Sequence, residues 1–416
     1  MPEQIVNKFH VAPVWLNRDY VEKKLRVYFK DAKLELEQLQ IQPATANGEN
    51  YASVMTRINV EYKDKDLVHH NATFLVKTTF ADKDPAAHLL EPYGIYVREI
   101  NMYEEVLPKL AEILRQEMGD PRKLFAATIN VDRERDSIMF EDMSLKKYYV
   151  ADRIKQLDRQ QTQLVLEKLA VFHALAALLN EKQPGIFAKK YDRCFFNQHT
   201  RGYQPIMQNM VKALIRSLED DEELHQRYAG KLKGVVEHIM EYCERAMETK
   251  KNDFVTLCHG DLWTTNMMFK NNDHGKPDNV LFIDFQFSVW SSPAIDLQYF
   301  FHTSLQDDIC HTEMVHFYHQ KLVQALNKLK FKGRIPTLFD FQQQYQSRAF
   351  YAIFAGFCFL PSMLHSGKEE FSIARAMSHS KIDADFRAKL YKTEIMRSKL
   401  KKFLPKFDHK GLLDDM

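Results

Sequence analysis

Hydrophobic and polar residues alternate with a period of two in the first third of the chain. Two strand-like runs, residues 51–62 and 68–79, lie on either side of the polar segment 63–66, and Val54, Thr56, Ile58 and Val60 alternate in the first of them, which predicts a half-exposed β-hairpin. Two shorter apolar runs, 124–131 and 137–140, predict a second pair of strands. The first part of the chain is therefore expected to carry an antiparallel sheet.

Two helices are predicted in the same region. Residues 16–39 carry apolar side chains at helical spacing, and turn-forming residues at 45–50 end the pattern. Residues 92–114 carry an apolar stripe that includes Leu107 and Leu110. Helices combined with an antiparallel sheet are typical of the α+β class.

From about residue 152 most of the chain has helical spacing. The predicted helices are 154–179, 201–218, 222–249, 314–329, 337–360 and 373–403. An insert at 257–288 interrupts them with two strand-like runs. We therefore predict a mixed lobe over residues 1–142 and a larger helical lobe over residues 143–416, joined by a connector at 141–148.

Composition and charge exclude several classes of protein. With 45% hydrophobic residues the chain can bury a core, so wholesale disorder is not expected. The 58 basic and 56 acidic residues leave a net charge of +2, which gives no general electrostatic reason for a nucleic-acid partner.

The cysteines and the apolar runs point to the cytoplasm. Five scattered cysteines without a C-x-x-C pair disfavour a disulfide framework and a structural zinc site. The first 20 residues lack the apolar run of a signal peptide. The best apolar run, 350–360, is too short to cross a bilayer core of about 30 Å and predicts a buried helix. We expect a cytoplasmic protein without a membrane span.

The strongest chemical signal lies in residues 257–269. Asp261 and Asn266 stand five residues apart, His259 precedes Asp261 by two, and Asp284 ends an apolar strand-like run. Phosphoryl transfer needs one carboxylate to accept a hydroxyl proton, and oxygen ligands for Mg²⁺ on the ATP phosphates. Each piece alone is more often structural, but H-x-D-x-x-x-x-N followed by a strand-end Asp has the order of a kinase catalytic loop. The combination predicts a kinase.

The first lobe supplies candidates for binding the nucleotide. Lys77 follows three apolar residues in a predicted strand and suits the α- and β-phosphates. Glu99, 22 residues later on a predicted helix, suits the role of its partner, for which Glu104 and Glu105 compete. Ser53, in the turn before the first strand pair, is a candidate phosphate ligand. The chain has no G-x-G-x-x-G and no Walker motif, which disfavours a dinucleotide fold and a Walker-type ATPase.

Together these motifs resemble the ecdysteroid kinase-like, or CHK-type, family of insects and some other animals, which is related to the choline and aminoglycoside kinases. The similarity runs through most of the chain and is carried by residues 48–53, Lys77, 98–99, Tyr103, 107–108, 141–144, 258–266, 283–286 and 296–297. It implies a protein-kinase-like bilobal fold and transfer of the ATP γ-phosphate, with Mg²⁺, to a hydroxyl of a small molecule. Ecdysteroids and xenobiotic alcohols are the acceptors it suggests.

The resemblance also implies a role for each residue of the catalytic motif. Asp261 would be the base, and His259 would be structural within the same loop. Asn266 and Asp284 would bind Mg²⁺. Asp296 would brace the loop through its backbone.

For the nucleotide, the resemblance implies that Lys77 contacts phosphates and Glu99 pairs with it. The connector that begins at Glu141 would hold adenine, largely through main-chain groups. Gln286 stands where protein kinases have Gly, which argues against a protein-kinase activation segment.

The acceptor is specified only weakly. Trp263 and Trp290 flank the proposed centre and the last third of the chain is rich in aromatic residues, which favours an apolar acceptor, although such stripes are more often plain core. Two alternatives stay open. One is a choline- or aminoglycoside-type kinase with carboxylates around a cationic acceptor, and the other is a degenerate kinase that binds without turnover. We expect a monomer that acts on a small-molecule hydroxyl.

Overall fold

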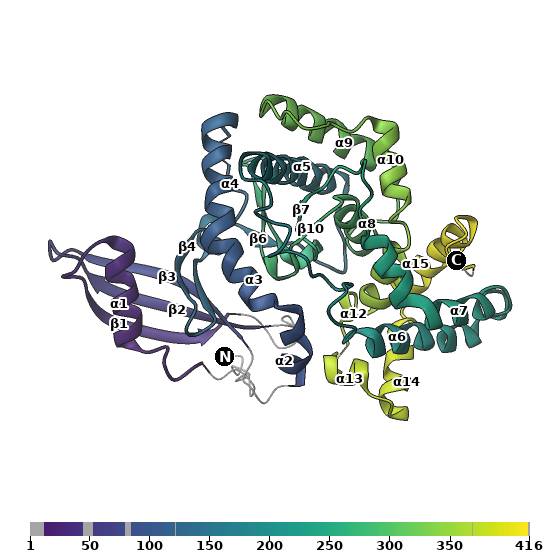
Figure 1. Cartoon of the computed structure of the whole chain (residues 1–416). Helices are drawn as coiled ribbons and strands as arrows, with labels where there is room; N and C mark the ends of the chain where they lie inside the picture. The colour runs from purple at the N-terminus through teal and green to yellow at the C-terminus, as the bar shows by residue number, and fades with distance from the viewer. Residues whose placement is uncertain (1–11, 45–52, 80–84, 121, 368, 415–416) are drawn as a thin grey trace.

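A sheet-containing lobe lies beside a larger helical lobe in the computed structural model (Figure 1). The structure describes residues 12–44, 53–79, 85–120, 122–367 and 369–414. The sheet has the order β1-β2-β3-β5-β4, and every neighbouring pair is antiparallel. Its strands are β1 (Glu35–Pro43), β2 (Val54–Lys63), β3 (His69–Thr78), β4 (Thr128–Asp132) and β5 (Ser137–Glu141). The predicted α+β class with an antiparallel N-terminal sheet is confirmed.

The helix predicted over 16–39 is wrong in its second half. Helix α1 covers only Arg18–Phe29, because Lys30 adopts the left-handed conformation (φ 54°) that ends it. The chain then enters β1, where Leu36 is buried and Glu35 is exposed. The alternation from residue 34 onward is the period-two signal of a strand, which the helical spacing of the same leucines concealed. Ser53 therefore follows the turn between β1 and β2, and most of that turn lies outside the described residues.

The two faces of the sheet have different partners. Val21 of α1 packs on one face with Ile58 and Val76 of the strands, and all three are buried. Because successive strand residues point to opposite faces, Lys77 and its cross-strand neighbour Met55 face away from α1. The strand lysine is thus presented on the face that α1 leaves open.

A helical segment between β3 and β4 confirms the helix predicted over 92–114. It consists of α3 (Ile95–Asn101) and α4 (Leu107–Ile113), joined by a π-helical turn at Met102–Val106. Ile100 belongs to a hydrophobic cluster that also contains Phe140 of the sheet and residues of the helical lobe. The segment lies between the two lobes (Figure 1) and so can present residues to both.

The helices of the second lobe agree with the prediction except in three places. They are α5 (Arg159–Lys182), α6 (Gln204–Ser217), α7 (Glu222–Met247), α8 (Ala294–Thr303), α9 (His311–Lys328), α10 (Leu338–Gln346), α13 (Ile373–Met377), α14 (Lys381–Leu390) and α15 (Glu394–His409), with short helical turns between α10 and α13. The helix predicted over 337–360 breaks after α10. The helix predicted over 373–403 is three helices, because Ser380 and Thr393 each cap a new helix by accepting a backbone N–H.

The third difference is α8, which no prediction covered. All ten of its residues are buried. A helix buried on every side has no polar face, so it lacks the amphipathic pattern by which helices are found in a sequence.

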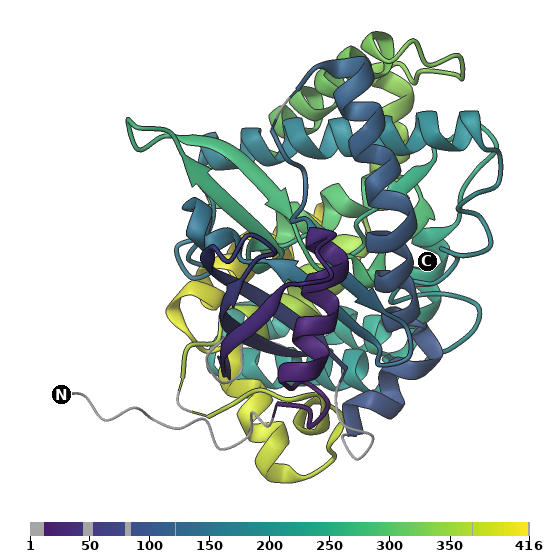
Figure 2. The ribbon, with the colours of Figure 1, turned by 90° about the vertical axis from the view of Figure 1, so that its left-hand side faces the viewer.

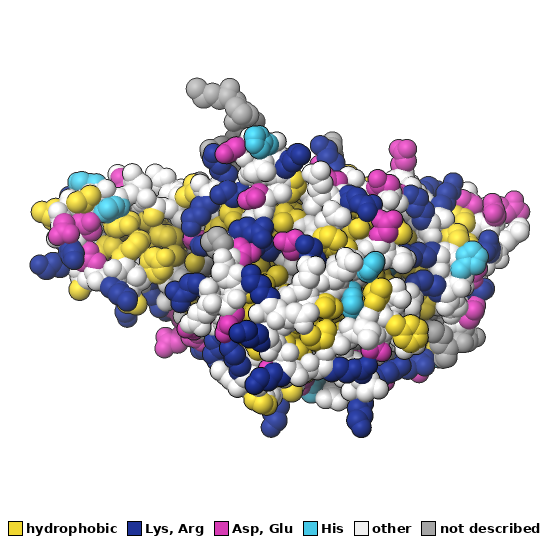
Figure 3. Space-filling model, turned by 90° about the horizontal axis from the view of Figure 1, so that it is seen from above, with side chains coloured by type: hydrophobic (Ala, Val, Ile, Leu, Met, Phe, Trp, Pro, Cys, Tyr) yellow, Lys and Arg dark blue, Asp and Glu magenta, His cyan; other side chains and the backbone are white. Residues whose placement is uncertain are grey.

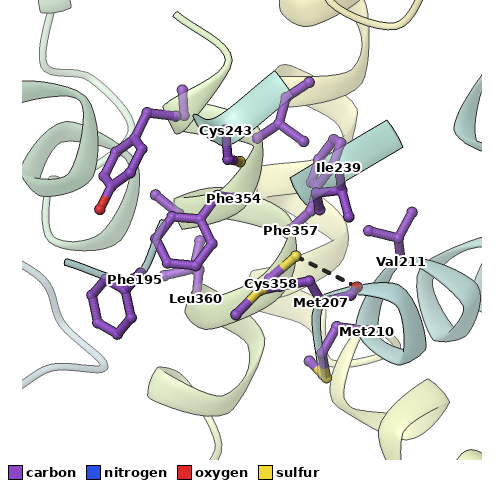
Figure 4. Packing of buried hydrophobic residues seen from close by; sticks show 14 of the residues in the cluster. Phe195, Met207, Met210, Val211, Ile239, Cys243, Phe354, Phe357, Cys358 and Leu360 are labelled. Carbon is purple, nitrogen blue, oxygen red and sulfur yellow. Dashed lines mark hydrogen bonds between the residues drawn. The ribbon is translucent and has the colours of Figure 1, made fainter. Parts of the chain in front are cut away.

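Aromatic and sulfur-containing side chains fill the core of the helical lobe (Figure 4). Phe354, Phe357 and Leu360 are fully buried there, and the Cys358 thiol donates a hydrogen bond to the Met207 carbonyl at 3.8 Å. The apolar run 350–360 is thus a buried helical segment, as predicted, with a π-helical turn at Phe354–Phe359. Within the described part of the chain, α5 has the length and apolar character to cross a membrane, and most of it is buried in the protein.

Two small sheets lie at the insert predicted over 257–288. Strands β6 (Tyr149–Val150), β8 (Met267–Asn271) and β9 (Pro277–Phe282) form one, and the β8–β9 hairpin projects from the lobe (Figure 2). In the other, β7 (Thr256–Cys258) pairs with β10 (Val289–Ser291). The chain leaves β7 at His259 and β9 just before Asp284, so both parts of the motif start from strand ends.

Charged side chains of both signs are interspersed on the face seen from above in Figure 3. This mixing accords with the net charge of +2. Any charge-based recognition by this face must therefore rely on individual side chains.

Candidate active site

The loop after β7 holds Asp261 in a fixed, buried position. Asp261 is 8% exposed. The Asn266 amide donates to the Asp261 carbonyl at 2.8 Å and to its Oδ2 at 3.1 Å. The Tyr299 hydroxyl donates to Oδ1 at 2.7 Å. Both carboxylate oxygens are therefore held by neutral donors, and the five-residue spacing between Asp261 and Asn266 closes the loop on itself.

His259 supports the loop from behind. Its ring is fully buried, with Nε2 3.0 Å from the Ile283 carbonyl and Nδ1 accepting the Asp261 N–H at 3.3 Å. Burial also lowers the pKa of His259, so the ring is neutral and its Nε2–H donates to the carbonyl. These contacts join the loop to the residue before Asp284 and fit the structural role that the resemblance implies.

Asp296 anchors the same loop from helix α8. Its carboxylate accepts the N–H groups of His259 at 2.7 Å and Gly260 at 2.8 Å, and His173 Nε2 lies 3.1 Å away. His173, Cys258 and Asp296 bring possible metal-binding atoms within 4.8 Å of one another. Because those Asp296 oxygens already accept backbone N–H groups, we interpret this cluster as a brace for the loop.

Lys77, Glu99 and Asp284 meet where the two lobes face each other. The Lys77 ammonium lies 2.7 Å from Asp284 Oδ1 and 2.8 Å from Glu99 Oε2. The predicted pairing of Lys77 with Glu99, across 22 residues, is present, whereas Glu104 contacts Arg133 and Glu105 contacts Lys190.

Asp284 itself occupies an unusual backbone conformation. Its φ of 67° and ψ of 62° lie in the left-handed region, which a non-glycine residue seldom adopts. Next to Glu99 on α3, the Arg98 guanidinium donates to the Gln286 carbonyl at 3.1 Å and ties the turn after Asp284 to that helix. The conformation that turns Asp284 toward Lys77 is thus supported from α3.

Burial and neighbouring charges shift the ionisation of the site. Burial raises the pKa of Asp261 to about 7, the negative charge of Asp284 adds to the rise, and the hydrogen bonds from Tyr299 and Asn266 oppose it. Burial lowers the pKa of Lys77, but the carboxylates of Asp284 and Glu99 more than offset this and raise it above its ordinary value. A proton acceptor with a pKa near neutrality thus lies close to a stable ammonium.

Ser53 and Glu141, the other predicted nucleotide ligands, lie at the ends of strands. Ser53 is buried immediately before β2. The Glu141 carboxylate accepts hydrogen bonds from Lys123, Lys146 and the Ala127 N–H. Burial raises the pKa of Glu141, yet these bonds hold it below its usual value. Its side chain is therefore engaged in holding the connector, which leaves main-chain groups for a ligand.

The donor set fits a magnesium ion and a phosphate. The Asn266 amide nitrogen is committed to Asp261, so its carbonyl oxygen is the atom left for a cation. The Asp284 side chain is 27% exposed and supplies carboxylate oxygen. Oxygen ligands of this kind are what Mg²⁺ prefers, and the adjacent Lys77 ammonium suits a phosphate group.

The class of protein follows from two features. A small antiparallel-sheet lobe lies beside a helical lobe, and Lys77, Asp261, Asn266 and Asp284 form the candidate site. The protein is a kinase-like phosphotransferase with an alcohol group as acceptor, and its substrates are small molecules. The Ecdysteroid kinase-like family matches residues 47–331, and the chain belongs to that family.

Solved structures of two small-molecule kinases are similar to this chain. Choline kinase LicA from Streptococcus pneumoniae is 14% identical, and the match covers 80% of this chain and 98% of that chain with a TM-score of 0.34. A glucosamine kinase, solved with glucosamine, ADP and inorganic phosphate, is 11% identical and covers 85% of this chain and 97% of its own, with a TM-score of 0.30. No curated protein sequence matches.

Two residues that hold the site were not predicted from the sequence. Tyr299 contacts Asp261 across 38 residues, and His173 contacts Asp296 across 123 residues. His173 left no local signal. Tyr299 follows Asp296 by three positions, one helical turn, and could have been found if α8 had been predicted.

Proposed function

We propose that this protein transfers the γ-phosphate of ATP, with Mg²⁺, to a hydroxyl of an ecdysteroid or another lipophilic alcohol. The observation that carries the proposal is the convergence of Asp261, Asn266, Asp284 and Lys77 from three separate segments. Phosphoryl transfer needs a proton acceptor, oxygen ligands for the metal and a cation on the phosphates, and these four side chains supply them.

Each side chain has a distinct role in the proposed reaction. Asp261 takes the proton of the acceptor hydroxyl while the acceptor oxygen bonds to the γ-phosphorus and the bond from that phosphorus to the ADP oxygen breaks. Asn266 and Asp284 hold Mg²⁺, which neutralises charge on the phosphates. Lys77, oriented by Glu99, binds the α- and β-phosphates.

The nucleotide side is completed by two further proposals. Ser53 offers its hydroxyl to the phosphates from the start of β2. The connector after Glu141 holds adenine through main-chain groups, since the Glu141 carboxylate is occupied by two lysines.

Aromatic rings beside the proposed base support an apolar acceptor. Tyr299, which contacts Asp261, lies within 6.3 Å, between ring centroids, of Phe195, Phe354 and Phe359. Phe195 also stacks on Phe287 at 3.9 Å, three residues after Asp284. Of these rings Phe359 is only partly buried. Except for Phe359 these rings are buried in the core, so they give the surroundings of the proposed base an apolar character, which favours a largely apolar molecule that carries a hydroxyl.

The acceptor class can be tested with a panel of alcohols. Purified protein is incubated with ATP, Mg²⁺ and an ecdysteroid, a sterol, a phenol, choline or glucosamine, and products are detected by the mass gain of one phosphate. We expect the lipophilic alcohols to be phosphorylated and EDTA to abolish the reaction. Choline is included because aromatic rings also bind quaternary ammonium groups. Preference for choline or glucosamine over the lipophilic alcohols would overturn the proposed acceptor class. ATP binding without transfer to any acceptor would indicate a non-catalytic protein.

Lys77→Met is expected to weaken nucleotide binding about 10- to 100-fold, since a hydrogen bond between charged groups contributes roughly 1.5–3 kcal/mol. Titration with a fluorescent ATP analogue measures the change. Lys63→Met is the matched control, because Lys63 lies at the far end of β2, 33% exposed, and pairs with Glu37. Equal affinity of the two variants would contradict a phosphate-binding role for Lys77.

A further inference from the structure

Helix α8 holds the catalytic loop at two successive turns. At the first turn, Asp296 accepts the backbone N–H groups of His259 and Gly260. At the second, the Tyr299 hydroxyl lies 2.7 Å from Oδ1 of Asp261. The helix that fixes the loop backbone therefore also reaches the side chain proposed as the base.

The ring of Tyr299 leaves its hydroxyl little freedom. Tyr299 is 1% exposed. Its ring stacks on Phe195 with centroids 6.2 Å apart, and Phe354 lies 5.9 Å away (Figure 4 shows these two phenylalanines). A close-packed aromatic ring cannot swing its hydroxyl away without displacing its neighbours.

Asp261 has charged neighbours in the same site. The positive charge of Lys77 acts on Asp261, and Lys77 already bonds to Asp284 and Glu99. A carboxylate held only through Asn266 would keep more freedom to rotate about its Cβ–Cγ bond. A neutral donor on Oδ1 opposes this rotation without adding a charge.

We propose that Tyr299 is a positioning residue, whose hydroxyl holds Oδ1 of Asp261 so that the free lone pairs of the carboxylate face the acceptor hydroxyl. This inference rests on the proposed function, because it concerns the base of that reaction. Tyr299 itself neither accepts the proton nor contacts the nucleotide in this arrangement.

Another buried tyrosine of the same cluster provides a matched control. Tyr351 is also 1% exposed, and its ring centroid lies 6.2 Å from that of Tyr299. Its hydroxyl, however, faces the Cys194 sulfur at 3.8 Å instead of a carboxylate. Tyr299→Phe and Tyr351→Phe thus remove the same atom from the same core, but only the first removes a contact to Asp261.

We expect Tyr299→Phe to lower kcat by about 10- to 100-fold, which corresponds to one hydrogen bond to a charged group. The KM for ATP should stay within about twofold of the wild-type value, and Tyr351→Phe should keep kcat within about twofold. The concentration of ATP-binding protein is measured by nucleotide titration, and kcat is calculated from that concentration. A partly unfolded sample then does not lower the measured kcat. A wild-type kcat for Tyr299→Phe would overturn the inference.

A double-mutant cycle with Asp261→Asn separates positioning from general packing. If Tyr299 acts through Asp261, its substitution has no further effect on the residual rate of Asp261→Asn. An equal loss in both backgrounds would show a packing role and overturn the inference. If the wild type phosphorylates alcohols and Tyr299→Phe has the same kcat, the positioning role of Tyr299 is wrong but the proposed function stands. If wild type and Asp261→Asn turn over equally, the proposed base fails and the positioning role falls with it.

Discussion

Asp261→Asn is expected to lower kcat for phosphate transfer by about 10²- to 10⁴-fold, the usual effect of losing a general base. An asparagine side chain keeps the shape of the aspartate but cannot accept a proton at its amide. Its oxygen can still accept from Asn266, and its amide can donate to the Tyr299 oxygen, so the loop geometry is retained. Steady-state kinetics with the best alcohol acceptor measures the loss, and ATP affinity should change little.

The same substitution should stabilise the protein at alkaline pH. Because burial raises the pKa of Asp261 from 3.8 to about 7, folding favours its protonated form. The carboxylate therefore destabilises the folded state increasingly as the pH rises from 4 to 7, and fully above that. The unfolding temperature of Asp261→Asn should exceed that of the wild type more at pH 8 than at pH 5.

Asp273→Asn controls for the chemical change, since Asp273 is exposed at the tip of the β8–β9 hairpin. It should change neither kcat nor the pH dependence of unfolding. If Asp261→Asn retains wild-type turnover, another residue accepts the proton, and the assignment of the base is wrong.

Local signals in the sequence explain which parts of the fold could be predicted. Val54, Thr56, Ile58 and Val60 recur at every second position of β2, because one face of the hairpin packs under α1 and the other does not. β1 was missed because its leucines fit a helical repeat as well as a strand. α8 was missed because tertiary burial on all sides removes the polar face that marks a helix.

The site was predictable where chemistry imposes spacing along the chain. Asp261 and Asn266 belong to one loop, and Lys77 and Asp284 are marked by apolar strands that end at them. Contacts such as that between Tyr299 and Asp261 depend on how α8 packs, which no local pattern encodes. Sequence spacing therefore identified the groups that we propose to react, whereas packing supplies the groups that hold them in place.

Gly260→Ala is expected to abolish most activity and to lower the unfolding temperature. Gly260 has a φ of +82°, and a Cβ there would lie 2.0 Å from the Phe287 carbonyl oxygen. The left-handed conformation alone costs about 1–2 kcal/mol for a residue with a side chain. The clash involves backbone, so it can be relieved only by moving the loop that carries Asp261 away from the turn that follows Asp284. That movement separates Asp261 and Asn266 from Asp284, the other proposed metal ligand.

Gly230→Ala shows what the same added methyl group does where nothing opposes it. Gly230 lies exposed within α7, and its added Cβ meets no atom within 4 Å. Alanine there should stabilise the protein by about 0.5–1 kcal/mol, because it restricts the unfolded chain and favours the helix. Thermal unfolding and kcat are measured for both variants side by side. The unfolding temperature should fall in Gly260→Ala and rise in Gly230→Ala. Only Gly260→Ala should lose activity. Wild-type kcat in Gly260→Ala would mean that the loop and the Phe287 turn need not touch for catalysis, since a protein with this methyl group cannot keep both in place.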